Sequence, residues 1–181
     1  MLPVLVLILF CSGVALYCQT QLWQGSEKIS TGYAKIRSDG GETLRIFNKR
    51  IKIGSLGSLL KRRAEGELSV EGQVSQKVDI IIDRVKTILE MHPRNFTVQI
   101  NVLPDAQSVR AAYRKKYYRE VDFVAFYAPA EKAIYIAADE AKAVVLAHEL
   151  AHAVIDQFFG VAAPTKIHEL LAQYVEENFE E

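Results

Sequence analysis

The chain has 181 residues, half of them apolar, and its 22 lysines and arginines balance its 22 aspartates and glutamates. This length predicts one domain of ordinary size, because a single hydrophobic core typically serves roughly 100–200 residues. The apolar fraction excludes a disordered tail protein, and the zero net charge argues against a nucleic-acid binder, which usually carries a basic excess. The only cysteines are Cys11 and Cys18, so a disulfide-stapled secreted scaffold is excluded as well.

An uncharged apolar run covers residues 2–17. Its length of about 15–16 apolar residues fits the hydrophobic region of a secretory signal and is marginal for a membrane span, which needs roughly 20. We therefore expect residues 1–18 to be a signal peptide or an N-terminal membrane anchor. The protein is then exported, and it is either secreted or periplasmic, or held at the membrane through residues 2–17. A buried core segment is the alternative interpretation.

Residues 19–72 give weaker signals. Residues 19–42 are polar and contain glycine, a composition typical of a linker or an irregular arm. Residues 43–70 combine two strand-like pieces, TLRIF and RIKIG, with a stretch SLGSLLKRRAEG that favours a short helix. We expect the folded domain to occupy residues 73–181.

The first elements of this domain have clear patterns. Apolar residues recur at helical spacing over residues 73–91, and Pro93 ends that helix. Alternating apolar residues predict a strand over residues 96–103. Asp105 is a candidate cap for a helix over residues 106–118, whose basic side chains and tyrosines are interpreted as a solvated surface.

A β-hairpin is predicted over residues 123–137, where two alternating apolar stretches flank the turn sequence APAEK. Asp139 is a good N-cap for a long helix over residues 140–159, and Gly160 favours its termination. A last helix is predicted over residues 166–179.

The long helix contains the sequence HELAH. The spacing of four places the imidazoles of His148 and His152 on one helix face, which is the geometry a Zn²⁺ ion needs from two nitrogen ligands. Glu149 is rotated about 100° from His148 and can take a proton from metal-bound water. The flanking residues are uncharged, and burying these polar groups among them is unfavourable unless a metal compensates. A pair of surface or hydrogen-bonded histidines is the alternative.

A catalytic zinc site needs a third protein ligand and an open position for water. The last helix offers Glu169 and His168, which are adjacent in sequence but about 100° apart around the helix. Glu169 lies beside the small Ala172, which allows two helices to approach closely, so spacing favours Glu169 and leaves His168 as a rival. Glu176 belongs to the acidic end EENFEE and is interpreted as solvated.

The segments VVLAHELAHAVI and PTKIHELLAQYVEE resemble the gluzincin zinc metallopeptidases, which are zincin-like, peptidase MA-like enzymes. In that family a helix with two histidine ligands and a general-base glutamate precedes a helix with a glutamate ligand. The resemblance implies that His148, His152 and Glu169 hold one Zn²⁺ ion and that Glu149 is the base. The chain has Leu170 where the family pattern usually has glycine.

The resemblance also implies an α+β fold with a minimal zincin-like core. Such a core has a small mixed β-sheet, an edge hairpin packed on the active-site helix, and a C-terminal ligand helix. The segment VAFYAPAEKAIYIAA looks like that hairpin, whose first strand binds extended peptides by backbone pairing. The implied substrate-binding residues are Val124, Ala125, Phe126 and Tyr127, and an ordinary structural hairpin is an equal alternative.

Two further residues are candidates for supporting roles. Tyr174 is a candidate oxyanion donor, although its place on the apolar stripe of Ile167, Leu170, Leu171 and Val175 favours core packing. Asp156 follows His152 by one helical turn and is a candidate acceptor that orients this imidazole, or else a plain surface carboxylate.

The resulting hypothesis is zinc-dependent peptide-bond hydrolysis by an endopeptidase, with a zinc-activated water and Glu149 as general base. The expected partner of the protein is a peptide or protein substrate, and no nucleic-acid partner is expected. One alternative is a zinc-stabilised binding module of the cell envelope with little or no activity. Another is an anchored protein whose helix over residues 73–91 docks a second chain.

Overall fold

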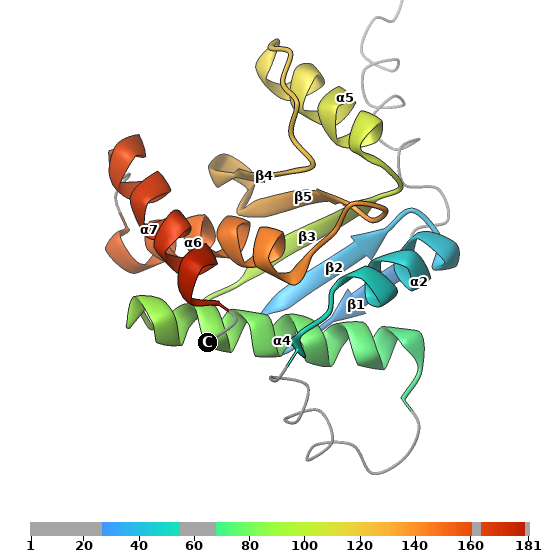
Figure 1. The fold of residues 1–181 in the computed structure, drawn as a ribbon, viewed down its shortest axis with the longest axis horizontal. Helices are drawn as coiled ribbons and strands as arrows, with labels where there is room; N and C mark the ends of the chain where they lie inside the picture. Colours follow the sequence, from blue (N-terminus) through green and yellow to red (C-terminus); the bar gives the residue numbers. More distant parts are fainter. Residues whose placement is uncertain (1–26, 55–67, 161–163, 180–181) are drawn as a thin grey trace, which may run out of the picture.

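The structure is a computed structural model that describes residues 27–54, 68–160 and 164–179 (Figure 1). Five strands form one sheet in the order β1-β2-β3-β5-β4. The strands are β1 (Glu27–Ser30), β2 (Ala34–Ser38), β3 (Val98–Leu103), β4 (Ala125–Ala128) and β5 (Ala133–Ala137). β2, β3 and β5 are mutually parallel, whereas the outer strands β1 and β4 run antiparallel to their neighbours. The α+β class and the small mixed sheet predicted from the sequence are therefore confirmed.

One face of the sheet packs on helices α2 (Gly41–Arg50), α4 (Val70–Leu89) and α6 (Ala143–Phe159) (Figure 1). Isoleucines of the three parallel strands, together with apolar side chains of α4 and α6, are fully buried in this core: Ile36, Ile100, Ile134, Ile136, Ile81, Leu146 and Leu150. The opposite face carries a smaller cluster, in which Val109 of α5 (Ala106–Tyr117) packs with Phe126 and Ala137. The sheet and α4 thus hold α6 along most of its length.

Helix α7 (Thr165–Asn178) packs on α6 with a narrower apolar face than the sequence predicts. Ala172 and Val175 are fully buried, which confirms that the small alanine lies at the helix contact. Ile167, Leu170 and Tyr174 are 43%, 62% and 50% exposed. The predicted apolar stripe is therefore divided between the core and the surface.

The linker predicted for residues 19–42 is wrong from residue 27 onward, because β1 and β2 occupy this part of the chain. The piece TLRIF is likewise not a strand, since it lies in α2, where Leu44 and Phe47 are fully buried at a spacing of three. Ile51 and Ile53 of RIKIG are buried outside any strand. The helix predicted from SLGSLLKRRAEG lies outside the described residues.

The elements predicted after residue 72 are present with shifted ends. α4 begins at Val70 and α7 at Thr165. In the hairpin, β5 has the predicted bounds, β4 begins two residues later than predicted, and a short 3₁₀ helix (Pro129–Glu131) joins the two strands. Asp105 does cap α5, because its Oδ1 accepts a hydrogen bond of 2.7 Å from the backbone N–H of Ser108. Asp139 does not cap α6, which begins after a turn, with Lys142 as its N-cap. Gly160 ends α6 in the left-handed conformation, with φ 67°.

None of the described helices combines the length and the hydropathy that crossing a membrane requires. The apolar run over residues 2–17 lies outside the described part of the chain. Its role as a signal peptide or an anchor stays a prediction.

Asp79 of α4 fastens the turn between β1 and β2, since it accepts hydrogen bonds from the Thr31 hydroxyl (2.6 Å) and the Gly32 N–H (3.2 Å). We expect Asp79→Ala to lower the free energy of unfolding by about 1–3 kcal/mol, because both donors lose a charged partner. Asp83→Ala, one turn later on the same helix, is the control, and we expect it to change stability by about 0.5 kcal/mol or less. Equal losses in urea unfolding would contradict this role.

Candidate metal centre

Helices α6 and α7 bring three potential metal ligands together. The Nε2 atoms of His148 and His152 are 3.2 Å apart. The Glu169 carboxylate completes a triangle, with Oε2 3.7 Å from His148 Nε2 and Oε1 3.7 Å from His152 Nε2. Ligand atoms about 2.0–2.1 Å from a tetrahedral ion are about 3.3 Å apart, so these separations fit a bound ion closely. The group could hold a metal ion.

The local sequence explains this placement. Apolar residues bury one side of α6 against the sheet and α4, which leaves His148, Glu149 and His152 on the side toward α7 and β4. Gly160 ends α6, and α7 packs back on it through Ala172. Glu169, one turn before Ala172, therefore reaches the two imidazoles.

The second ring nitrogen of each histidine also has a neighbour. His148 Nδ1 lies 3.1 Å from Glu176 Oε1, so Glu176 is exposed, as predicted, and also contacts a candidate ligand. Glu176 lies in the last turns of α7, and its partly exposed side chain reaches His148 of α6. No signal in the acidic sequence EENFEE distinguishes it from its neighbours.

His168 is not part of the ligand triangle. Its Nδ1 lies 3.4 Å from His152 Nδ1, on the side of the imidazole away from the triangle, and its Nε2 lies 3.3 Å from Asp156 Oδ1. Asp156 thus pairs with His168 and not with His152, the partner suggested by sequence spacing. The packing of α7 on α6 determines this pairing, because it places the His168 ring between the side chains of Asp156 and His152.

Glu149 lies beside the triangle in a largely buried position. Burial raises the pKa of its carboxyl to about 8, a hydrogen bond from the Tyr127 backbone N–H opposes that rise, and the Glu169 and Glu176 carboxylates add to it. Burial lowers the pKa of His152 to about 4, and the neighbouring His148 and His168 lower it further. A neutral imidazole at pH 7 is the form that binds a metal.

In the metal-free protein, Glu149→Gln is expected to become more stable than the wild type as the pH rises. The folded state retains the Glu149 proton up to its pKa of about 8, whereas the unfolded chain releases it near 4.5, so folding loses stability between these values. Glutamine does not titrate, so the variant lacks this pH-dependent loss of stability. His152 is present in both proteins, so its contribution to the pH dependence cancels in the comparison. Urea unfolding in the presence of a chelator measures the free energy of unfolding of both proteins at pH 6 and pH 8. The same stability difference between Glu149→Gln and the wild type at both pH values would contradict the expectation.

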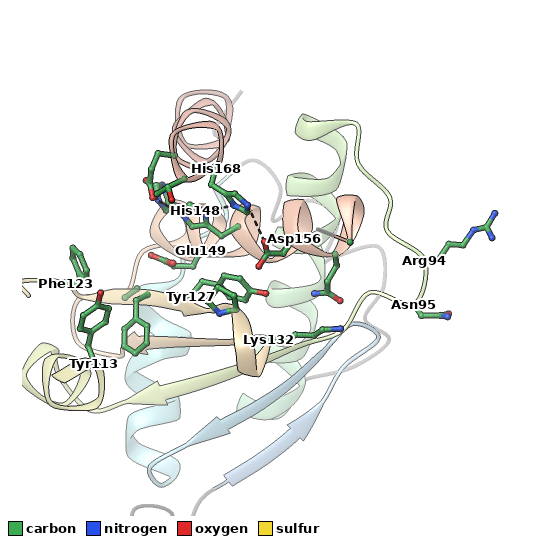
Figure 2. A pocket seen from close by; sticks show the side chains of 18 residues that line it. Arg94, Asn95, Tyr113, Phe123, Tyr127, Lys132, His148, Glu149, Asp156 and His168 are labelled. Carbon is green, nitrogen blue, oxygen red and sulfur yellow. Dashed lines mark hydrogen bonds and ion pairs between the residues drawn. The ribbon is translucent and has the colours of Figure 1, made fainter. Parts of the chain in front are cut away.

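A cavity of about 1060 Å³ opens beside the triangle. Figure 2 shows it between β4 and the two helices, with Phe123 and Tyr113 toward one end and Lys132 and Arg94 toward the other. Of the predicted substrate-binding residues, Ala125, Phe126 and Tyr127 line it. Val124 and the predicted oxyanion donor Tyr174 are not among the lining residues in the described part of the chain.

Strand β4 is an edge of the sheet and forms one wall of the cavity. The Ala137 N–H donates to the Val124 carbonyl at 2.9 Å, which fixes the alternation of the antiparallel ladder. Phe126 and Ala128 therefore pair with β5, whereas the backbone groups of Ala125 and Tyr127 face the free edge. The Tyr127 N–H contacts Glu149, so the edge strand and the potential base are directly connected.

Comparison of the chain with protein-family models, with curated proteins and with solved structures finds no match. The resemblance to gluzincins therefore stays a prediction from the two sequence segments that carry it. The function has to be inferred from the chemistry of the site.

Proposed function

We propose that the protein is a zinc metallopeptidase of the gluzincin type that cleaves peptide bonds. The observation that carries this proposal is the triangle of His148, His152 and Glu169, whose ligand atoms are 3.2–3.7 Å apart, with Glu149 beside it on the same helix. Two imidazoles and one carboxylate in this arrangement match the donor set of catalytic zinc sites, and they leave one tetrahedral position open. With a divalent ion bound, the single carboxylate ligand would leave the site with a net charge of about +1.

The chain's own residues supply the acid–base chemistry. A bound zinc ion would provide a Lewis acid that acidifies water and polarises the scissile carbonyl. Glu149 then accepts the proton of the attacking water and passes it to the leaving amine. The carboxylate form of Glu149, which burial disfavours, is favoured beside a dication, and the Tyr127 N–H holds the side chain in place.

The edge strand supports a peptide as the substrate. The backbone groups of Ala125 and the carbonyl of Tyr127 face the free edge of β4, where an extended peptide can add by strand pairing. The Tyr127 N–H is already taken by Glu149. The cavity of about 1060 Å³ lies at the upper limit of small-molecule pockets, which span roughly 300–1,000 Å³. A segment of several peptide residues fits this space, and it would cross the ligand triangle.

A zinc-stabilised binding module is the second candidate. One observation favours it: Tyr174, the predicted oxyanion donor, is half exposed and is not among the residues that line the cavity in the described part of the chain. Such a module would hold the ion and a peptide without turnover.

Zinc stoichiometry and a peptide-library cleavage assay on the full chain test the proposal. We expect about one equivalent of zinc and cleavage that a chelator abolishes and added zinc restores. One equivalent without cleavage supports the binding module. Absence of both zinc and cleavage contradicts both zinc functions and favours a partner protein that docks through α4, the helix predicted over residues 73–91. Where zinc is bound, N-terminal sequencing of the mature protein would show whether residues 1–18 are removed.

A further inference from the structure

Three side chains form a continuous line behind the ligand triangle. His152 Nδ1 lies 3.4 Å from His168 Nδ1, and His168 Nε2 lies 3.3 Å from Asp156 Oδ1. The two imidazole rings stack, with centroids 5.6 Å apart and 27° between their planes. All three side chains are largely buried, with 13%, 12% and 21% of their surface exposed for His152, His168 and Asp156. Figure 2 shows His168 directed at Asp156.

The hydrogen bonds along this line all run in one direction, from His152 to His168 to Asp156, because each contact needs one donor and one acceptor. Two neutral imidazole nitrogens that face each other must be one donor and one acceptor, and a carboxylate can only accept. Asp156 therefore requires the proton of His168 on Nε2, which leaves His168 Nδ1 as an acceptor. His152 must then carry its proton on Nδ1 and present a lone pair at Nε2, the atom in the ligand triangle.

The opposite arrangement is unfavourable. With a proton on His152 Nε2, His168 would donate from Nδ1 and direct the lone pair of Nε2 at the Asp156 carboxylate, so that two acceptors would face each other in a largely buried place. We propose that His168 and Asp156 are positioning residues, which fix His152 in the tautomer that can bind the metal through Nε2. This inference rests on the metal site of the proposed function, but not on peptide hydrolysis.

The surroundings of Asp156 support this role. Burial raises the pKa of the Tyr127 hydroxyl above its ordinary value, and the nearby Asp156 carboxylate raises it further, so the hydroxyl keeps its proton beside Asp156. Asp156 thus lies near one side chain of β4, Tyr127, and one of α7, His168. The other ligand, His148, has a carboxylate neighbour at Nδ1 directly, since Glu176 Oε1 lies 3.1 Å away.

Histidine tautomers in the metal-free full chain give the first test. Long-range ¹H–¹⁵N NMR separates the Nδ1–H, Nε2–H and doubly protonated forms, and the chain has only four histidines to assign. At pH 7.5 we expect His152 with its proton on Nδ1 and His168 with its proton on Nε2. A proton on Nε2 of His152, or a doubly protonated His168, overturns the proposal.

Zinc affinity, measured by competition with a chelator, gives the second test. His168→Leu is expected to weaken zinc binding about 10–100-fold, the usual cost of removing an outer partner of a histidine ligand. His168→Asn retains an acceptor near the position of Nδ1 and should recover most of this loss. Asp156→Asn keeps the size of the side chain but can donate to His168, so it should allow the wrong tautomer of His152 and weaken binding about 10-fold.

Gln173→Leu is the matched control, because Gln173 is exposed on the same helix as His168. We expect its zinc affinity to equal that of the wild type. Wild-type affinity in both His168→Leu and Asp156→Asn overturns the proposal. A chain that binds zinc with the expected tautomers but cleaves no peptide contradicts the proposed function alone.

Discussion

Glu149→Gln is expected to retain one equivalent of zinc and to lose peptide hydrolysis by about 10²–10⁴-fold in kcat, the range that general acid–base catalysis supplies. The side-chain oxygen of glutamine can still accept from the Tyr127 N–H, so the geometry beside the triangle is preserved. Glutamine cannot take a proton from water. The ligand triangle of His148, His152 and Glu169 is untouched, because it does not include Glu149.

The measurement compares zinc content and kcat/KM for a peptide that the wild type cleaves. Glu177→Gln is the matched control, because Glu177 is an exposed glutamate of α7 that takes no part in the ligand triangle. We expect it to hydrolyse the same peptide at the wild-type rate. Hydrolysis by Glu149→Gln at that rate would contradict the assignment of the base, and loss of its zinc would show that Glu149 is a ligand.

The part of the candidate site that lies within a single helix is predictable from the sequence. The spacing of His148 and His152 fixes their relation within one helix, and no tertiary information is needed for it. Glu169 was favoured over His168 by its neighbour Ala172, whose complete burial at the α6–α7 contact is observed. The grouping of these three side chains depends on two helices only, α6 and α7.

The parts that sequence could not provide depend on contacts between distant segments. β2 pairs with β3 from Ala34 opposite Val98 onward, a register that no feature of the short, polar sequence of β1 and β2 indicates. The contacts of His168 and Glu176 depend on the rotation of α7 about its axis. Its apolar stripe is wider than the face that it buries, so the pattern alone leaves that rotation undetermined.

Removal of zinc is expected to loosen α7 before it affects the sheet. α7 buries mainly Ala172, Val175 and the adjoining Phe179, whereas α6 is enclosed by β4, β5, α4 and α7. Cysteines occur only at positions 11 and 18, so no disulfide joins the two helices. Without an ion, the carboxylates of Glu169 and Glu176 also lie near Glu149 with no cation between them.

Hydrogen exchange measures this effect residue by residue. At a zinc concentration about 100 times Kd, binding stabilises the bound form by about 2.7 kcal/mol, which corresponds to about 100-fold slower exchange wherever opening releases the ion. We expect this slowing over α7, with little change in β3 and α4. Glu169→Gln in the presence of zinc should reproduce the metal-free pattern, whereas Gln173→Leu should keep the zinc-bound one. Equal protection of residues 141–179 with and without zinc would show that packing alone holds α7, since Arg84 also donates a 2.7 Å hydrogen bond to the Asn178 carbonyl at its C-terminal end.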